Sequence, residues 1–286
     1  MRETGETGET SATPHHDVRL RAPDGPPPGR AATDAPRRRP LTYPGAWPDR
    51  SVLVAGDHEW AVDLPPGSSV GAALVDDGPG GRSLDDVLLG LGVAPIADRE
   101  PVLAVGSNAS TAQLRHKAES TDMSPVVPML RAQVRGVMVG VAPKVFAPGY
   151  VPAAPVFDPA ARAMMFVQWL DAAQLDALDR TERAYDRREL IGRNVSVELP
   201  SGASLGRCFG YVATLGYLVD DADEPIALPP DQTALLTDLL SRSPRLRELM
   251  GPTPAAWIRT VREGGRPVAT EVERIFAAEG WVRSQF

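Results

Sequence analysis

The sequence predicts a protein of the α/β class, in which short strands and amphipathic helices follow one another along the chain. Two segments carry this prediction. An apolar run at 101–105 leads through Gly106-Ser107-Asn108 into a helix start, and a second apolar run at 166–170 leads into another helix start at Asp171. Such units pack their helices against a sheet around a hydrophobic core. We therefore expect a main, soluble α/β domain over residues 100–250.

The composition argues against several classes of protein. A chain of 286 residues, 43% of them hydrophobic, is long enough for one large domain or two modest ones. The formal net charge of -7 argues against a nucleic-acid partner, because such binders carry a basic surplus. No stretch approaches the roughly 18 apolar residues that cross a bilayer, and the N-terminus lacks the apolar segment of a signal peptide. We expect no membrane association.

Cysteine usage points to a reducing compartment. The chain has a single cysteine, Cys208, so it forms no intrachain disulfide, and a zinc site built on thiolates is not expected. Cys208 lies in an apolar-leaning run and is interpreted as a small core residue. We therefore expect a cytoplasmic protein without a bound metal.

Residues 1–48 are predicted to be a disordered tail. They contain a repeated Gly-Glu-Thr triplet, many prolines and few apolar residues that a core would bury. Within this tail, Arg37, Arg38 and Arg39 are interpreted as a solvated charge cluster, with contact to an acidic partner as the alternative.

Residues 51–98 are predicted to form an accessory hairpin and helix packed on the main domain. Two short strands flank the turn Gly56-Asp57, and Ser83 precedes apolar residues at helical spacing. Asp57, His58 and Glu59 are interpreted as turn and edge residues rather than metal ligands, because neighbours in a strand point to opposite faces.

The turn at Gly106 is the first candidate site. Ser110 and Gln113 have the spacing of a capping box for the helix that follows. We expect backbone N–H groups to stay unpaired at this helix start, where they bind a carboxylate or a developing oxyanion. Gly106 would allow close approach of a ligand, while Ser107 and Asn108 would add side-chain donors. The alternative is an ordinary turn that binds nothing.

The second candidate is Glu182, which continues the apolar face of the helix after Asp171. Leu175, Leu178 and Glu182 fall at i, i+3 and i+7. A buried carboxylate carries a desolvation cost unless it is paired, and burial raises its pKa toward that of a general base working near neutrality. The alternatives are that the helix has ended by Thr181, or that Glu182 pairs with an arginine at 187–188.

Residues 251–286 are predicted to be a C-terminal helical extension, which follows an amphipathic helix beginning after Asp231. Thr253-Pro254 marks one helix start, and Thr270 with Glu273 has the spacing of a capping box for another. The sequence leaves open whether these helices cover the main domain or form a dimer surface, so the oligomeric state is not assigned.

Together and in this order along the chain, the two candidate sites are a more specific signal of a protein family than either site alone. VLAVGSN, followed by a helix, resembles the YGSN loop of the γ-glutamylcyclotransferase-like superfamily. FVQWLDAAQLDALDRTERAYDRREL is similar to that family's strand, helix and catalytic-glutamate segment, and VSVELPSGASLGRCFGYVA is similar to its final strands. The resemblance spans roughly residues 102–212.

The resemblance implies a fold and a reaction. The fold is a mixed sheet curved into a small barrel and flanked by helices, and the chemistry needs no cofactor. A small-molecule γ-glutamyl amine or peptide would bind with its α-carboxylate near Gly106, Ser107 and Asn108. Glu182 would take a proton from the α-ammonium group, and the freed amine would attack the γ-carbonyl and expel the amine, leaving 5-oxoproline.

Two positions depart from the family pattern. Val105 stands where an aromatic residue usually precedes the Gly-Ser-Asn triplet, and Arg183 follows the glutamate where glycine is common. Tyr185 or Tyr211 is a candidate to replace the missing hydroxyl. The implied substrate-binding set is Val105, Gly106, Ser107, Asn108, Tyr185 and Tyr211.

Three possible functions are compared. The leading one is a γ-glutamyl cyclotransferase-type enzyme, with a changed substrate as the expected consequence of Val105 and Arg183. The alternative is a non-catalytic binding or scaffold protein that retains the fold. A nucleotide-binding domain is disfavoured, because no Gly-rich phosphate motif follows any strand.

Overall fold

The computed structural model describes residues 30–78, 80–192 and 194–285. Its strands are β1 Val52–Ala55, β2 His58–Asp63, β3 Leu74–Val75, β4 Arg82–Ser83, β5 Glu100–Ala104, β6 Val126–Val141, β7 Ala153–Leu170, β8 Tyr185–Glu189, β9 Ser196–Glu198, β10 Phe209–Ala213, β11 Tyr217–Leu218 and β12 Val282–Arg283. Its α-helices are α1 Leu84–Gly90, α2 Thr111–Ser120, α3 Ala172–Thr181, α4 Gln232–Arg242, α5 Pro244–Met250 and α6 Pro254–Ala278. Short 3₁₀ turns include η1 Ala32–Asp34, η2 Pro40–Thr42 and η5 Gly106–Ala109.

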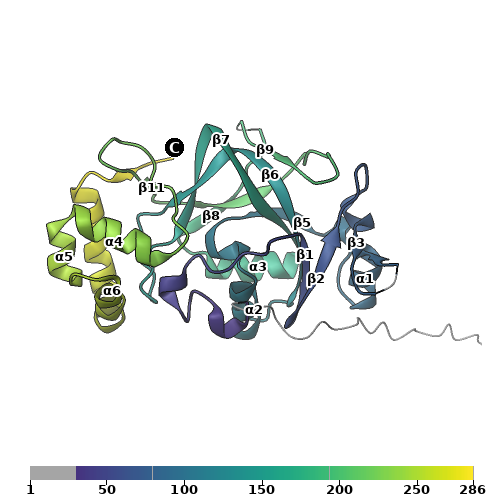
Figure 1. Ribbon diagram of the computed structural model, residues 1–286, viewed down its shortest axis with the longest axis horizontal. Coiled ribbons are helices and arrows are strands. Elements are labelled where there is room, and N and C mark those ends of the chain that lie inside the picture. The colour runs from purple at the N-terminus through teal and green to yellow at the C-terminus, as the bar shows by residue number, and fades with distance from the viewer. Residues whose placement is uncertain (1–29, 79, 193, 286) are drawn as a thin grey trace, which may run out of the picture.

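A mixed ten-stranded sheet forms the centre of the molecule, in the order β4-β3-β2-β1-β6-β7-β5-β10-β8, with β9 paired to β6 (Figure 1). Its pairs are antiparallel except β5 with β10, which is parallel. The predicted mixed α/β class with flanking helices is therefore confirmed. The sheet is open, however, because no pairing among the described residues joins its end strands β4 and β8. The curvature expected of a barrel is present without closure.

The long strands β6 and β7 supply that curvature. Their register shifts between Arg135 and Val137, and the residue between them, Gly136, has a φ of +82°. Gly136 of β6 is opposed by the four residues 158–161 of β7, so the extra residues bulge from β7 and increase the local twist. The halves of β6 and β7 beyond the bulge consequently extend toward the C-terminal helices (Figure 1).

Alternating apolar residues give the sheet two buried faces. Val52 and Val54 of β1 share a cluster with Leu114 of α2 and Leu178 of α3, so these two helices cover one face. Leu53, which lies between those valines, belongs to the cluster on the opposite face. This alternation is the expected result of the two-residue period of a strand.

The hairpin of β1 and β2 belongs to this sheet. It turns at Gly56-Asp57, with Ala55 opposite His58. β1 also pairs with β6, so the hairpin extends the central sheet rather than forming a separate layer. The helix that follows, α1, begins where its N-cap was predicted, since the Asp86 backbone N–H donates to Ser83 Oγ at 3.1 Å.

The N-terminal segment contradicts part of the predicted tail. Residues 1–29 of the expected disordered region lie outside the described residues, but residues 30–48 pack against the domain. Tyr43 is only 3% exposed, and Trp47 Nε1 donates to the Gly106 carbonyl at 3.1 Å. The segment is held by single aromatic side chains and by polar contacts with distant residues. Such contacts leave no run of apolar residues in the sequence, so the segment was predicted to be disordered.

The C-terminal helices lie at one end of the molecule (Figure 1), and they share with the end of β6 a hydrophobic core that contains the fully buried Trp257. Thr253 caps α6 as predicted, accepting from the Ala256 backbone N–H at 3.2 Å. The predicted capping box at Thr270 is wrong, because α6 runs past it to Ala278, with a break at Gly265. The Glu273 side chain instead accepts from Lys144 Nζ at 3.1 Å. Among the described residues, no helix combines the length and apolar character needed to cross a membrane.

Candidate functional site

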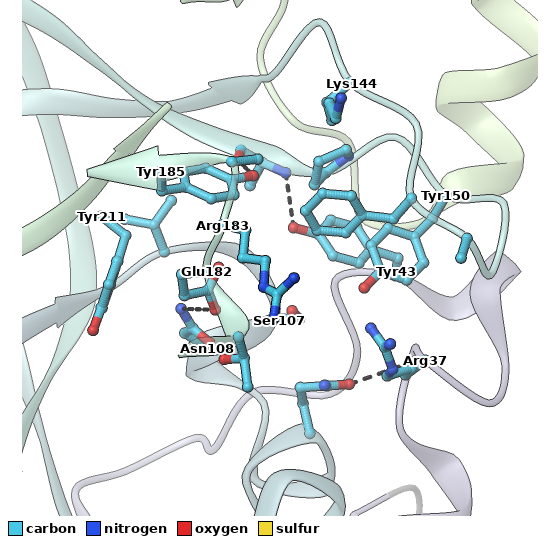
Figure 2. Close-up of a pocket in the computed structure, with 18 of the residues that line it drawn as sticks. Arg37, Tyr43, Ser107, Asn108, Lys144, Tyr150, Glu182, Arg183, Tyr185 and Tyr211 are labelled. Atoms are coloured by element: carbon cyan, nitrogen blue, oxygen red, sulfur yellow. Dashed lines mark hydrogen bonds between the residues drawn. The ribbon is translucent and has the colours of Figure 1, made fainter. Parts of the chain in front are cut away.

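A pocket of about 840 Å³ lies where the N-terminal segment, η5 and α2, the loop between β6 and β7, and the loop between α3 and β8 meet. Its volume is in the range typical of small-molecule sites. Figure 2 shows that both candidate sites reach it, because Ser107 and Asn108 come from the Gly106 turn and Glu182 from the end of α3. The tertiary structure thus brings the two sequence candidates together.

The Gly106 turn has a stringent geometry. Gly106 has a φ of +61°, and a Cβ added there would lie 2.5 Å from the Tyr43 hydroxyl and 2.6 Å from Ala153 Cβ. Glycine is therefore required for both conformation and space. Gly106 itself does not line the pocket; it supports the neighbours that do, Val105 and Ser107.

The backbone of this turn differs from the expectation. Residues Gly106–Ala109 form a 3₁₀ turn, in which the Asn108 N–H donates to the Val105 carbonyl at 3.4 Å and the Ser110 N–H to the Ser107 carbonyl at 3.0 Å. These two N–H groups are used within the turn, so they are not available to a ligand. The predicted capping box is also absent, since Ser110 makes no side-chain cap.

Glu182 occupies the end of α3 rather than its apolar face. The capping box predicted at the helix start is present, because Asp171 Oδ1 accepts from the Gln174 N–H at 2.9 Å. The helix ends at Thr181, and Glu182 follows with non-helical dihedrals of -97° and 41°. The proposed i, i+3, i+7 face is therefore wrong for Glu182. Leaving the helix at this residue is what turns its carboxylate toward the Gly106 turn.

The carboxylate of Glu182 is held by one of its two oxygens. Lys117 Nζ donates to Oε1 at 2.7 Å, and Asn108 Nδ2 donates to the same oxygen at 3.2 Å. Lys117 Nζ also donates to Asn108 Oδ1 at 2.8 Å, which closes a three-residue network. Among the described residues, none donates to Oε2. Glu182 is 12% exposed at the pocket wall, so Oε2 is the oxygen available to a ligand.

The partner of Glu182 was not predicted from the sequence. The arginines expected there are engaged elsewhere, since Arg187 Nη2 lies 3.0 Å from Asp179 Oδ2 and Arg188 Nη2 lies 2.9 Å from Asp186 Oδ2. Lys117 looks like an ordinary exposed residue of α2 in the sequence, yet its side chain is only 9% exposed. The sequence places Lys117 in the helix that follows the Gly106 turn, and nothing in its spacing singles it out.

The two predicted tyrosines line the pocket, but their hydroxyls are committed to the protein. The Tyr185 hydroxyl donates to the Ala153 carbonyl at 2.8 Å, and the Tyr211 hydroxyl donates to Asp179 Oδ1 at 2.7 Å. In Figure 2, the Tyr211 hydroxyl points away from Glu182. Both hydroxyl protons are therefore engaged, and neither is free to replace the hydroxyl that is missing at position 105.

Tyr43, from the segment predicted to be disordered, lies beside Val105 and the Gly106 turn. Its hydroxyl oxygen accepts from the Ala153 N–H at 2.7 Å, and its ring stacks on Tyr150 with centroids 4.5 Å apart (Figure 2). Burial raises the pKa of Tyr43 far above its ordinary value, although the bond from Ala153 opposes this. Tyr43 is therefore a neutral O–H donor at the pocket wall.

Cations outnumber carboxylates around this pocket. Among the described residues, Glu182 is the lining carboxylate, whereas the lining cations are Arg37, Lys117, Lys144, Arg180, Arg183 and Arg266. Burial, followed by the nearby Arg38 and Arg37, lowers the pKa of His116, another lining residue. The site is thus suited to a ligand that carries negative charge.

Two other predictions concern groups outside the pocket. Cys208 is fully buried, and burial raises the pKa of its thiol to about 12, so it is a core residue rather than a nucleophile. Glu59 is not an edge residue, because it is buried and accepts from Arg115 Nη1 at 2.9 Å and Arg30 Nη1 at 2.8 Å. No cluster of three or more potential metal-ligating side chains occurs within the described part of the chain.

Comparison with known proteins gives matches among solved structures alone. No protein-family model matches the sequence, and no curated protein matches it. A structure described as "Gamma-glutamyl cyclotransferase" matches at 16% identity and a TM-score of 0.33, covering 65% of this chain and 89% of its own. An uncharacterized protein from Homo sapiens matches with the same values. A protein from Arabidopsis thaliana matches at 12% identity and a TM-score of 0.32, covering 53% of this chain and 87% of its own.

The first of these matches has the kind of fold that the sequence resembles. The likeness concerns the arrangement of the chain alone. The chemistry of the site therefore rests on its own residues.

Proposed function

We propose that this protein is a γ-glutamyl cyclotransferase-type enzyme that releases 5-oxoproline from a γ-glutamyl amine or peptide, with Glu182 as the general base. The observation that supports this most directly is the free oxygen of Glu182. Lys117 and Asn108 both bind Oε1, so Oε2 is turned to the pocket without a protein donor among the described residues. A carboxylate held in this way is pre-oriented to accept a proton from an ammonium group.

In the proposed reaction, the substrate α-ammonium donates to Glu182 Oε2 and loses one proton to it. The neutral amine attacks the γ-carbonyl carbon, a C–N bond forms, and the carbonyl electrons move to oxygen. Collapse of this intermediate re-forms the carbonyl and breaks the bond to the leaving nitrogen. The departing nitrogen takes the proton held by Glu182, which returns Glu182 to its carboxylate form, and the ring nitrogen passes its extra proton to the released amine. Holding the amine and the carbonyl in one folded conformer supplies much of the acceleration.

The remaining pocket groups have complementary roles in this proposal. The Tyr43 O–H and the Ser107 hydroxyl are the donors available to the developing oxyanion, in place of the N–H groups used within the turn. Arg183 lies beside Glu182 and makes no ion pair among the described residues, so we assign it to the substrate α-carboxylate. Val105, Asn108, Tyr185 and Tyr211 would shape the wall around the glutamyl group. The buried, solitary Cys208 is compatible with a cytoplasmic enzyme.

The test is whether the protein releases 5-oxoproline from a panel of γ-glutamyl amines and dipeptides, with mass spectrometry to detect the product. We expect Glu182→Gln to reduce turnover by at least about 10³-fold, because the amide cannot accept the proton. The thermal unfolding midpoint of the variant should confirm that it is folded. Release at the same rate by the wild type and the variant would contradict the assignment of Glu182.

The second candidate function is non-catalytic binding, and the Lys117–Glu182 ion pair is the observation that favours it. A lysine that permanently neutralises the carboxylate would make Glu182 a binding group rather than a base. In that case the wild type and Glu182→Gln would both bind γ-glutamyl ligands, and neither would release 5-oxoproline from any panel member.

A further inference from the structure

One wall of the pocket is the loop of residues 142–152, which joins β6 to β7. In Figure 2, Tyr150 of this loop lies beside Tyr43 and away from Glu182. Under the proposed function, Glu182 and Arg183 bind the α-carbon end of the substrate, so the amine to be released extends toward another wall. The loop is a candidate for that wall, because its pocket-lining residues are Lys144, Val145, Phe146, Ala147, Tyr150 and Pro152.

The C-terminal helices hold this loop through Gln232, the first residue of α4. The Val151 N–H donates to Gln232 Oε1 at 2.9 Å, and Gln232 Nε2 donates to the Val151 carbonyl at 2.9 Å. One side-chain amide thus satisfies both polar groups of a backbone residue, as a neighbouring strand would. Val151 directly follows Tyr150, so the place of this tyrosine depends on the two bonds.

Gln232 is itself firmly placed. Asp231 caps α4, since its Oδ1 accepts from the Ala234 N–H at 3.0 Å. Leu235, in the first turn of the helix, shares a hydrophobic core with Val151. Gln232 is fully buried, so it contacts the loop and not a ligand in the pocket. A buried amide costs free energy unless its hydrogen bonds are made, and both bonds of this one go to the loop.

Two further contacts connect the loop to α6. Trp257 Nε1 donates to the Gly149 carbonyl at 2.9 Å, and Glu273 Oε1 accepts from the Val145 N–H at 3.3 Å. Both contacts reach backbone groups of the loop, as those of Gln232 do. Hydrogen bonds depend on direction, so they fix the course of the backbone more specifically than apolar packing does. The C-terminal helices therefore determine where this wall of the pocket lies.

We propose that Gln232 is a positioning residue of the pocket, which sets the wall at Tyr150 and thereby the size of the amine that the site accepts. This inference rests on the proposed function and adds a specificity determinant to it. The two bonds to Val151 keep the Tyr150 ring stacked on Tyr43, with centroids 4.5 Å apart. Without them the loop would move, and a large amine would lose its contact with this wall. A small amine that does not reach the wall would be little affected.

Hydrogen exchange of residues 142–152 tests the structural part of this proposal. Gln232→Met keeps the length of the side chain and loses both bonds. Ser243→Ala is the matched control, because Ser243 is also fully buried in the C-terminal helices but makes its two hydrogen bonds there, with Leu246 and Glu279. We expect Gln232→Met to speed exchange in the loop by about tenfold or more, and Ser243→Ala to leave it unchanged.

Binding of a large and a small ligand tests the functional part. Isothermal titration calorimetry is carried out with γ-glutamyl-phenethylamine and γ-glutamyl-methylamine, in a Glu182→Gln background that blocks turnover. Gln232→Met should raise the dissociation constant of the phenethylamine ligand about fivefold or more, and that of the methylamine ligand less than about twofold. Ser243→Ala should keep the original ratio of the two constants. Unchanged loop exchange, equal weakening of both ligands, equal effects of the two variants or no binding of either ligand would overturn the proposal.

Gln232→Glu is a conservative variant that can restore the two bonds. A protonated carboxyl accepts from the Val151 N–H and donates to the Val151 carbonyl, as the amide does, whereas an ionised carboxyl cannot donate. Burial raises the pKa of a carboxyl, which favours the protonated form. At about pH 5, Gln232→Glu should therefore keep the ratio of dissociation constants that the parent protein has at the same pH. A ratio at this pH equal to that of Gln232→Met would show that the bonds do not set the wall.

Turnover of the same two compounds by protein that retains Glu182 separates this inference from the proposed function. A size-dependent binding ratio that requires Gln232, without release of 5-oxoproline, would mean that Gln232 positions a binding wall and that the proposed reaction is wrong. Release with the same KM for the phenethylamine ligand in the wild type and Gln232→Met would support the reaction and contradict the role of Gln232. If both proposals hold, this KM should rise while kcat changes less than about twofold, because Lys117 and Asn108 hold Glu182 independently of the loop.

Discussion

The hydroxyl of Tyr43 is a polar group of the pocket that was not predicted from the sequence. Its oxygen accepts from the Ala153 N–H, and its proton has no acceptor among the described residues, so it is directed to a ligand. It brings an aromatic hydroxyl from the N-terminal segment to the Gly106 turn, beside Val105. Under the proposed function, this hydroxyl would take the role of the aromatic residue that Val105 replaces.

Tyr43→Phe is expected to separate the role of the hydroxyl from that of the ring. The variant keeps the stack on Tyr150 and leaves the buried Ala153 N–H unpaired, at a cost of about 1–3 kcal/mol in the free energy of unfolding. If the hydroxyl stabilises the oxyanion, kcat should fall by about 10–10³-fold with a small change in KM. Urea denaturation and steady-state kinetics measure the two effects, and unchanged kcat would assign Tyr43 to packing alone.

Gly106 shows how a single missing Cβ shapes the site. Gly106→Ala and Gly56→Ala both place alanine at a φ near +60°, namely +61° and +58°. The Cβ at position 106 would collide with Tyr43 and Ala153, whereas nothing lies within 4 Å of it at position 56. We expect both variants to lose about 1–2 kcal/mol through backbone strain, and Gly106→Ala to lose about 1–3 kcal/mol more. Equal free energies of unfolding in urea would show that Tyr43 shifts without cost.

At the scale of elements, the position of Glu182 depends on how α3 is joined to β8 and β10. Asp179 of α3 accepts from Arg187 Nε of β8 at 3.1 Å and from the Tyr211 hydroxyl of β10 at 2.7 Å. These contacts hold the last turn of the helix, and thereby Glu182, over the edge of the sheet. Tyr211 therefore acts on the position of Glu182 through Asp179, and its hydroxyl does not enter the pocket.

This junction should depend on pH. Burial acts to raise the pKa of Asp179, but hydrogen bonds from Arg187 and Tyr211 outweigh it and lower the pKa below the ordinary 3.8. The stabilising contribution is therefore present above about pH 3.8 and is lost as the pH falls through the folded-state value. Because the pair is partly exposed, Asp179→Asn should cost up to about 1 kcal/mol at pH 7.

The measurement is urea denaturation of the wild type and Asp179→Asn between pH 7 and pH 3. The difference between the two free energies of unfolding should shrink as the pH falls. Asp122→Asn, at an exposed aspartate without an ion pair among the described residues, should differ little from the wild type at any of these pH values. A constant difference for Asp179→Asn would contradict the lowered pKa.

At the scale of the whole molecule, a buried ion network attaches the N-terminal segment to the domain. Glu59 of β2 binds Arg30 from this segment and Arg115 from α2, and the side chains of Glu59 and Arg115 are 3% and 2% exposed. Arg115 Nη1 also donates to the Arg30 carbonyl at 2.6 Å. The segment attached here carries Arg37 and Tyr43 to the pocket, so this distant network supports the site.

Glu59→Gln is expected to affect both stability and activity. Removing the charge leaves Arg115 buried without its carboxylate, at a cost of about 3–5 kcal/mol in the free energy of unfolding. It should also increase proteolysis of residues 30–48 and raise KM, because the segment is less firmly held. Asp34→Asn breaks an exposed pair and should cost no more than about 1 kcal/mol. Equal effects of the two variants would show that the network does not anchor the segment.

Local features of the chain were accessible from the sequence. The strand–turn–helix unit at Gly106, the helix start at Asp171, the N-cap Ser83 and the turn at Gly56 are all present in the structure. Each depends on neighbouring residues, whose spacing determines capping and alternation. The mixed α/β class with flanking helices follows from such units, and so does the choice of Glu182 and the Gly106 turn as candidates.

Only the tertiary structure decided which side chains meet. The end of α3 at Thr181 directs Glu182 to Lys117, and Tyr43 and Arg37 come from a segment whose composition predicted disorder. The end strands β4 and β8 do not pair with each other among the described residues, so the sheet is open where a barrel was expected. These outcomes depend on contacts between residues far apart in the chain, whose energies do not appear in the local pattern of residue types. The candidates Glu182 and the Gly106 turn could therefore be chosen from the sequence, whereas the residues that contact them could not.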